Sequence, residues 1–295
     1  MQSHNRTRAG GKNRPPAPPR TATAIVRHYV ALQKAYGRQH WWPARSRFEV
    51  ILGAFLTQNT AWQNVELALR NLRRARGLSM DAIRHTPERK LARLIRPSGY
   101  FRQKAKRIKS FVRFLDAECH GSLEQLLAAS PGTSIEKLRD RLLDLHGIGP
   151  ETADSILLYA GNHPVFVVDA YTRRILSRHG LISANANYDE VQALVESAMA
   201  ARPLPLAEEK NLGHGRSRMS RMKRGDLAQH YNEFHGLLVE LGKEHCHKSQ
   251  PDCAGCPLKR FLPKRERKEL GLKQSARSQD MVTILNTRRV TRFDS

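Results

Sequence analysis

Apolar residues recur every three or four positions over most of this 295-residue chain, which is the spacing of helices that bury one face. Between Phe48 and Leu72 the period is interrupted by a polar stretch, Thr57-Gln-Asn-Thr60. Helices are predicted over 21–36, 48–72 (interrupted at 57–60), 80–94, 103–115, 123–127, 135–145, 151–159, 170–179, 189–201 and 226–243. Only Val165–Val168 has the pattern of a buried strand, so the pattern predicts an all-α fold.

Three segments lack this period and are rich in basic residues. Residues 1–20 carry arginines and prolines without an acid, and we expect a disordered arm. Such an arm is either a tether to nucleic acid or a solvated tail without a specific role. Residues 203–225 are expected to be a flexible basic insertion, and 263–295 a basic tail. The formal net charge of +24 indicates a polyanionic partner.

Composition also narrows the class of protein. No apolar run approaches the roughly 18 residues that a membrane span requires, and no secretory signal begins the chain. Three of the 4 cysteines are clustered, which does not favour a secreted disulfide scaffold. We therefore expect a cytoplasmic, nucleoid-associated protein without a membrane partner, and a monomer.

A glycine hairpin joins two of the predicted helices at Leu145-His-Gly-Ile-Gly-Pro-Glu-Thr-Ala153. Gly147 and Gly149 permit positive φ and a close approach of the backbone. The helix that follows offers unpaired amides to an anion, and a phosphate needs donors of this kind. The pattern indicates a DNA-backbone contact, although a bare Gly-x-Gly also occurs in ordinary helix–helix turns.

Asp169 follows the apolar run 165–168 and precedes the predicted helix 170–179. At this place it is an expected N-cap, which fixes a carboxylate in one orientation. Such a fixed carboxylate is also suited to stabilising a nearby cation.

The sequence Leu-His-Gly-Ile-Gly-Pro-Glu-Thr-Ala-Asp resembles the helix-hairpin-helix of the endonuclease III superfamily of DNA glycosylases, also named after its Gly-Pro-Asp motif. Trp41-Trp42-Pro43 with Phe48, Leu56-Thr-Gln-Asn-Thr60 and the stretch from Arg96 to Arg107 resemble the endonuclease III-related branch that includes bacterial 3-methyladenine DNA glycosylases. The resemblance covers about residues 22–262, without the basic insertion. It implies base excision repair on double-stranded DNA that contains a damaged base.

The resemblance also implies a fold and a set of site residues. One helical lobe would be 46–160 with the hairpin, and the other would join 21–45 to 161–262. The catalytic residue would be Asp169. The damaged base, expected to be an alkylated purine, would be flipped into a pocket where indole rings attract its positive charge. The pocket residues would be Trp41, Trp42, Pro43 and Phe48, with Trp62 in the core. The DNA-binding residues would be Gln58, Asn59, Lys104, Gly147, Ile148, Gly149, Thr152 and Arg173.

Bifunctional members of the superfamily use a lysine in the second hairpin helix to form a Schiff base. Glu151 occupies the matching position, and no lysine occurs between residues 138 and 209. This predicts a monofunctional enzyme in which water attacks the sugar, with Glu151 as a first-turn helix acid. Leu52-Gly53-Ala54 lacks the glutamate of adenine-removing mismatch members. Two alternative functions remain: a bifunctional lyase on oxidised pyrimidines, and a DNA-binding protein of the same fold without catalysis. A uracil or thymine mismatch substrate also remains open.

Cys246, Cys253 and Cys256 have the first three spacings of the family's iron–sulfur loop, which holds a [4Fe–4S] cluster through four thiolates. Leu262 stands at the fourth position, and Cys119 is expected to be a buried thiol elsewhere. A cluster with a different fourth ligand such as His245 or His247, a zinc site and the absence of a metal all remain open. In each case we expect the loop to have a structural role.

Overall fold

The computed structural model describes residues 19–128, 134–201, 203–206 and 217–269. Within these ranges every regular element is helical, which confirms the all-α prediction. The helices are α1 (Pro19–Tyr36), α2 (Arg47–Thr57), α3 (Trp62–Arg74), α4 (Met80–His85), α5 (Glu88–Leu94), α6 (Phe101–Cys119), α7 (Leu123–Leu127), α8 (Ile135–Leu143), α9 (Pro150–Ser155), α10 (Ala170–Arg178), α11 (Tyr188–Ala200), α12 (Asp226–Glu244) and α13 (Lys264–Glu269). Short turns of other helix types are η1 (Arg96–Ser98), η2 (Ile156–Ala160) and η3 (Lys259–Phe261).

The prediction of a strand at Val165–Val168 was wrong. The segment is buried but has no neighbouring strand. Side chains bind its backbone instead: the Phe166 amide donates to Glu196 at 2.9 Å, and the Val168 amide donates to the Tyr188 hydroxyl at 3.2 Å. Buried backbone groups need partners, and here the helix α11 supplies them without a ladder.

Two predicted helices are divided in the structure. The predicted helix 80–94 is α4 and α5, because Thr86 precedes a proline and adopts an extended backbone with ψ 124°. The predicted helix 151–159 is α9 followed by the π-helical turn η2. Such turns inside a helix often occur at functional sites, and η2 contains the fully buried Tyr159.

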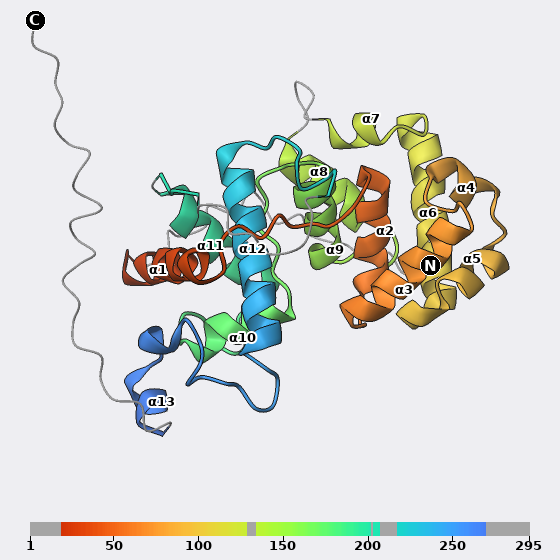
Figure 1. Ribbon diagram of the computed structural model, residues 1–295. Coiled ribbons are helices and arrows are strands. Elements are labelled where there is room, and N and C mark those ends of the chain that lie inside the picture. Colours follow the sequence, from red (N-terminus) through yellow and green to blue (C-terminus); the bar gives the residue numbers. More distant parts are fainter. Residues whose placement is uncertain (1–18, 129–133, 202, 207–216, 270–295) are drawn as a thin grey trace, which may run out of the picture.

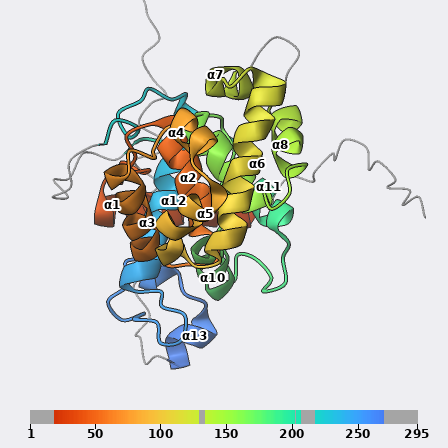
Figure 2. The same cartoon turned by 90° about the vertical axis from the view of Figure 1, so that its right-hand side faces the viewer.

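Helix α12 lies centrally in the fold, as Figure 1 shows. It packs against α1, α10, α11 and η2, while α2 packs against α3, α6, α9 and η2. The turn η2 therefore contacts both groups of helices. When the view is turned, α4, α5 and α6 come to the front and α13 lies at the bottom of the molecule (Figure 2). This grouping resembles the expected two lobes, whose boundaries remain a proposal.

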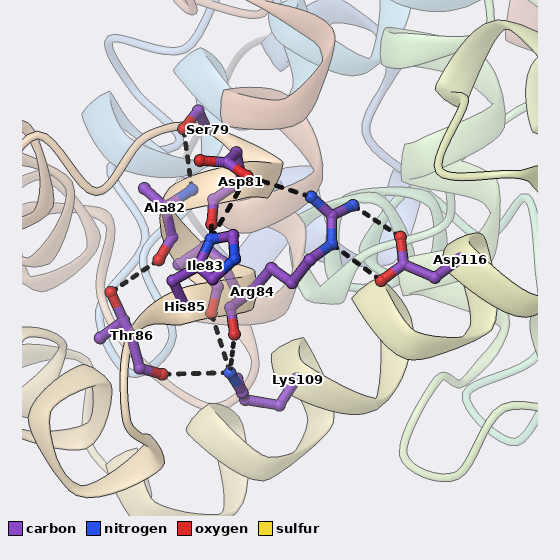
Figure 3. Close-up of polar contacts among 9 residues, drawn as sticks. All are labelled: Ser79, Asp81, Ala82, Ile83, Arg84, His85, Thr86, Lys109 and Asp116. Atoms are coloured by element: carbon purple, nitrogen blue, oxygen red, sulfur yellow. Dashed lines mark hydrogen bonds and ion pairs between the residues drawn. The ribbon is translucent and has the colours of Figure 1, made fainter.

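The short helix α4 is held to α6 by polar contacts at its C-terminal end (Figure 3). The Lys109 ammonium donates to the carbonyl oxygens of Ile83, Arg84 and Thr86 at 2.8–3.0 Å. These are carbonyls at the end of α4, which lack helical partners. The Arg84 guanidinium also forms two hydrogen bonds with the Asp116 carboxylate. The contacts order a helix of only 6 residues.

The predicted basic arm, insertion and tail lie largely outside the described residues, at 1–18, 207–216 and 270–295. The end of the insertion is described, and it packs against the protein. The Met219 amide donates to the Ala44 carbonyl at 3.1 Å, and the Ser217 hydroxyl donates to the Trp42 carbonyl at 3.1 Å. The flexibility of the insertion stays a prediction. Among the described helices, none has the length and apolar character needed to cross a membrane.

Candidate active site

A pocket of about 510 Å³ collects residues that are far apart in the sequence. They come from the segment before α2, the α2–α3 loop, the hairpin, the start of α10 and the middle of α12. The polar and aromatic residues around it include Trp41, Trp42, Gln58, Asn59, Trp62, Glu151, Thr152, Asp169, Tyr171, His235 and Lys243. Tertiary structure thus brings the predicted acid, hairpin and tryptophans to one place.

Asp169 is fixed at the edge of this pocket by the helix that it caps. Its Oδ1 accepts a hydrogen bond from the Thr172 amide at 2.7 Å, and the residue is 9% exposed. Burial alone would raise its pKa, but the neighbouring His235 ring and the bonds from Thr172 outweigh burial and hold the pKa of Asp169 below its usual value. The pocket therefore contains an ionised carboxylate at neutral pH.

His235 is the main residue of this site that the sequence analysis did not identify. Its Nε2 lies 3.5 Å from Asp169 Oδ2, and its Nδ1 lies 2.6 Å from the Tyr159 hydroxyl. A lone histidine on the apolar face of a helix gives no signal, because buried histidines that only pack are common. No local feature could have assigned His235 to the pocket, or the fully buried Tyr159 to a place behind it.

Glu151 lies in the same pocket, in the first turn of α9. Its side chain is exposed, but the walls of the pocket surround it. Burial within these walls, with the Asp169 charge as the second cause, raises the pKa of Glu151 to about 7. The pair therefore consists of one ionised acid and one that binds a proton near neutrality, which is an arrangement found at functional sites.

The aromatic part of the pocket differs in two ways from the expectation. Trp41 and Trp42 line it, with Trp42 buried and its ring centroid 5.2 Å from that of Trp62. Trp62 also lines the pocket and is half-buried, so its prediction as a core residue was wrong. Phe48 is instead a core residue, and Pro43 lines a separate groove, so neither reaches this pocket.

The position of Gly53 supports the absence of an adenine-removing acid. A Cβ atom added there would lie 3.0 Å from Cζ2 of the Trp42 indole, which packs directly over the helix α2. A glutamate at this position would displace the indole. The packing of Trp42 over position 53 is therefore compatible with glycine there and not with a glutamate.

Lys243 on α12 is a second pocket residue that the sequence analysis missed. Its ammonium lies 5.6 Å from the centroid of the Trp41 ring and 3.7 Å from Glu240 Oε2. The contact between the ammonium and the Trp41 ring is a cation–π interaction. It shows that the Trp41 face accepts a positive charge.

The hairpin joins the helices α8 and α9, in the helix-hairpin-helix arrangement that the sequence predicted. Gly147 has φ 85°, and a Cβ there would meet Arg107 Nε at 2.1 Å, so this position requires glycine. Gly149 has φ −99° and caps α9; it is exposed, and a Cβ there would meet nothing. Gly149 therefore does not use the positive φ that glycine permits, and its exposed backbone is left open to a partner. Ile148 is buried and anchors the turn.

The loop after α2 is bonded to this hairpin. The Gln58 amide donates to the Gly147 carbonyl and to Thr152 Oγ1, each at 3.0 Å, and accepts from Arg107 at 2.7 Å. Asn59 adopts a left-handed backbone with φ 52° and is exposed at the tip of the loop. Gln58 and Asn59 therefore stand at the mouth of the pocket, beside the hairpin.

Two of the predicted DNA-binding residues donate hydrogen bonds to main-chain carbonyls of the protein itself. Lys104 is 1% exposed, and its ammonium donates to the carbonyl oxygens of Leu56 and Ser98 at 2.9 and 2.6 Å. Burial, followed by the charge of Arg107, lowers the pKa of Lys104 to about 8. Its role is to hold the end of α2, so the prediction of a phosphate contact was wrong. Arg173 is half-buried and donates to the Ala186 carbonyl.

The three clustered cysteines line one cavity of about 250 Å³ together with His245 and Leu262. The Arg178 guanidinium contacts Cys246 Sγ at 3.2 Å, and burial raises the pKa of Cys256 to about 11. The apolar Leu262 supplies no fourth ligand, and His245 Nδ1 is bonded to Asp252 at 3.0 Å. In the described part of the chain no group of three or more histidine, cysteine or acidic side chains is arranged to hold a metal ion. These residues do not fit a four-thiolate cluster. Cys119 is buried in the core, as predicted.

Comparison with known proteins shows the family of this chain. Residues 52–200 match the family described as HhH-GPD superfamily base excision DNA repair protein. The chain is 42% identical over 237 residues to a Methanocaldococcus jannaschii protein named "Putative DNA repair glycosylase MJ1434", covering 80% of this chain and 94% of that protein. It is 26% identical over 218 residues to endonuclease III of Sulfolobus acidocaldarius, covering 74% and 82%.

Solved structures show the same relationship. The structure of H. pylori 3-methyladenine DNA glycosylase bound to 1,N6-ethenoadenine is 32% identical, has a TM-score of 0.59, and covers 76% of this chain and 97% of that chain. An endonuclease III–DNA complex shares the fold with a TM-score of 0.61 at 19% identity, covering 84% and 98%. The fold is that of the DNA glycosylases of base excision repair. The chain belongs to the HhH-GPD superfamily of base excision DNA repair proteins.

Proposed function

We propose that this chain removes an alkylated, positively charged purine from double-stranded DNA by hydrolysis of the N-glycosidic bond, without a lyase step. The observation that carries this proposal is the composition of one pocket. An ionised Asp169 shares that pocket with the indoles of Trp41, Trp42 and Trp62. Glu151, which cannot form an imine, occupies the position of the lysine in bifunctional relatives.

The aromatic rings suit a cationic base. An alkylated purine carries a positive charge, and stacking on an indole attracts it by about 0.5–2 kcal/mol. The solved H. pylori relative is a 3-methyladenine DNA glycosylase with a modified adenine bound, and this supports the same substrate class.

Asp169 would act on the sugar. Glycosidic cleavage passes through an oxocarbenium-like state, which a fixed carboxylate stabilises electrostatically. The same carboxylate would orient or deprotonate the attacking water. An alkylated purine leaves as a neutral base, so little acid assistance is needed. The low pKa of Asp169 suits this role, because the group must be ionised at neutral pH.

The hairpin and the α2–α3 loop would hold the duplex around the extruded nucleotide. The exposed backbone at Gly149 and the first-turn amides of α9 suit a phosphate. Gln58, with Asn59 beside it, would fill the gap left in the base stack. Because all of these groups belong to one chain, we expect a monomer to be sufficient.

A base-release assay tests the proposal. Duplexes containing 3-methyladenine, thymine glycol, uracil or a T:G pair would each be incubated with the protein, and we expect release of 3-methyladenine. Borohydride treatment on abasic DNA should trap no adduct. Release of thymine glycol together with a trapped adduct would instead identify a bifunctional lyase. No release from any substrate, with retained DNA binding, would identify a binding protein.

A further inference from the structure

His235, on α12, is buried beside Asp169. Its exposed fraction is 5%, and its Nε2 makes no hydrogen bond to any group in the described part of the chain. Asp169 Oδ2 lies 3.5 Å from this nitrogen. Asp169 Oδ1 is already bound by the Thr172 amide. The two oxygens of the carboxylate thus face two different donors.

The Tyr159 hydroxyl decides which ring nitrogen of His235 carries the proton. Burial, the largest cause, keeps the pKa of Tyr159 well above its ordinary value, so the residue is a neutral phenol with one proton to donate. Its hydroxyl lies 2.6 Å from His235 Nδ1. When the phenol donates to Nδ1, the imidazole proton must be on Nε2. The distance fits either direction of donation, and we assign the phenol as the donor. This assignment directs an N–H group of His235 at Asp169.

We propose that His235, oriented by Tyr159, is a positioning residue that holds Oδ2 of Asp169 through its Nε2–H and keeps the catalytic carboxylate ionised and in one orientation. This inference rests on the proposed role of Asp169. A separation of 3.5 Å is longer than a hydrogen bond, and such contacts shorten when a substrate completes the site. The role resembles the third member of a catalytic triad in logic, because one side chain orients another.

Other groups around the carboxylate do not replace His235. Glu151 faces it from α9 with an acidic group, and its charge opposes a second negative charge. Tyr159 faces it from η2 as a neutral phenol, and Thr172 contributes its amide from α10. Among these groups, His235 is the only basic side chain, and it lies 3.5 Å from Oδ2, while the Thr172 hydroxyl is a second side-chain donor beside the carboxylate.

The experiment compares the pH dependence of single-turnover base release in wild type, His235→Ala, His235→Gln and Tyr159→Phe. In His235→Ala we expect a rate roughly 10- to 100-fold lower, the effect of losing one hydrogen bond to a charged group. The acid limb should move to higher pH by about one unit, because Asp169 loses its donor. His235→Gln keeps an N–H donor and should recover much of both effects. Tyr159→Phe should lie between wild type and His235→Ala.

A matched control exists on the same helix. His230 is 7% exposed, and its Nδ1 lies 2.8 Å from the Tyr29 hydroxyl, in the same kind of pair but away from the pocket. His230→Ala should lower thermal stability without moving the acid limb. If His235→Ala keeps the acid limb of wild type, or if His230→Ala moves it equally, the inference is wrong.

A second measurement does not depend on turnover. NMR titration of the Asp169 carboxyl carbon reports its pKa directly in the folded protein. We expect a pKa below 3.8 in wild type, a higher value in His235→Ala and a restored low value in His235→Gln. An unchanged titration overturns the inference. A wild type that titrates as expected but releases no base overturns the proposed function alone.

Discussion

The side-chain amide of Gln58 donates to the main-chain carbonyl of Gly147 at 3.0 Å, although the two residues are 89 positions apart. The same amide reaches Thr152 in the first turn of α9. The loop that we expect to enter the base stack is therefore bonded to the hairpin that we expect to bind the phosphate. Gln58 therefore connects the two segments that we expect to contact DNA.

Replacing Gln58 by alanine removes both the filler of the duplex gap and this connection. We expect base release from a duplex to fall by roughly 10-fold, the value of about one hydrogen bond. Release from a single strand should change much less, because no gap must be filled there. Asn64→Ala removes another amide of the same region, one that bonds Thr60, and serves as the control. Equal losses on both strand forms would indicate a purely structural role.

Asp169→Asn separates chemistry from folding. The amide still caps α10, since asparagine and aspartate are equally good N-caps, so the loss of stability should be below about 1 kcal/mol. The negative charge is lost, and we expect base release to fall by roughly 10³-fold. Rates are measured in single turnover, stability by thermal unfolding and DNA affinity by titration. A variant that keeps most of its rate would exclude Asp169 as the catalytic group.

Glu151→Lys should introduce the nucleophile that the wild type lacks. Glu151 lines the same pocket as Asp169, so an amine there could reach the sugar of a flipped nucleotide. We expect borohydride to trap a covalent adduct with abasic DNA in this variant and none in wild type. Glu151→Gln is the isosteric control. Lys243 also lines the pocket, so the test is repeated in the double variant Glu151→Lys/Lys243→Ala. Trapping that persists in this double variant assigns the adduct to position 151.

Glu151 should also make stability depend on pH. Its pKa is raised from 4.5 to about 7 in the folded state, so the folded protein binds this proton more tightly than the unfolded chain. The resulting stability is present below about pH 4.5 and is lost as pH rises to about 7. Glu151→Gln should therefore melt at the same temperature as wild type at pH 4 and at a higher temperature above pH 7. Melting curves across this range test the sign, and a constant difference would contradict it.

The helices of the hairpin are joined by a buried ion pair. The Arg139 guanidinium on α8 donates to both oxygens of Asp154 on α9 at 2.7 and 3.1 Å, and Asp154 is fully buried. Arg139→Ala would leave this charge without its cation, and we expect a loss of about 3 kcal/mol in the free energy of unfolding. Arg84→Ala breaks the similar but exposed pair with Asp116 and should cost much less. Denaturant unfolding compares the two, and equal losses would contradict the role of burial.

Local sequence determined the parts of this protein that depend on neighbouring residues. The helical periods, the glycine hairpin with its positive φ at Gly147, and Asp169 as a helix cap are each set within a few residues. The strand predicted at 165–168 failed because an apolar run does not say whether backbone partners will come from a strand or from side chains. Here Glu196 and Tyr188 supply them.

Only the tertiary structure decided what surrounds the Asp169 carboxylate. His235 and Lys243 reach the pocket because of the rotation of α12 against α10 and η2, which no local pattern records. Long-range packing also places Trp62 at the pocket and buries Lys104, and neither position was predicted from the sequence. A helix period tells which face is buried, whereas the partner of that face is fixed by long-range packing.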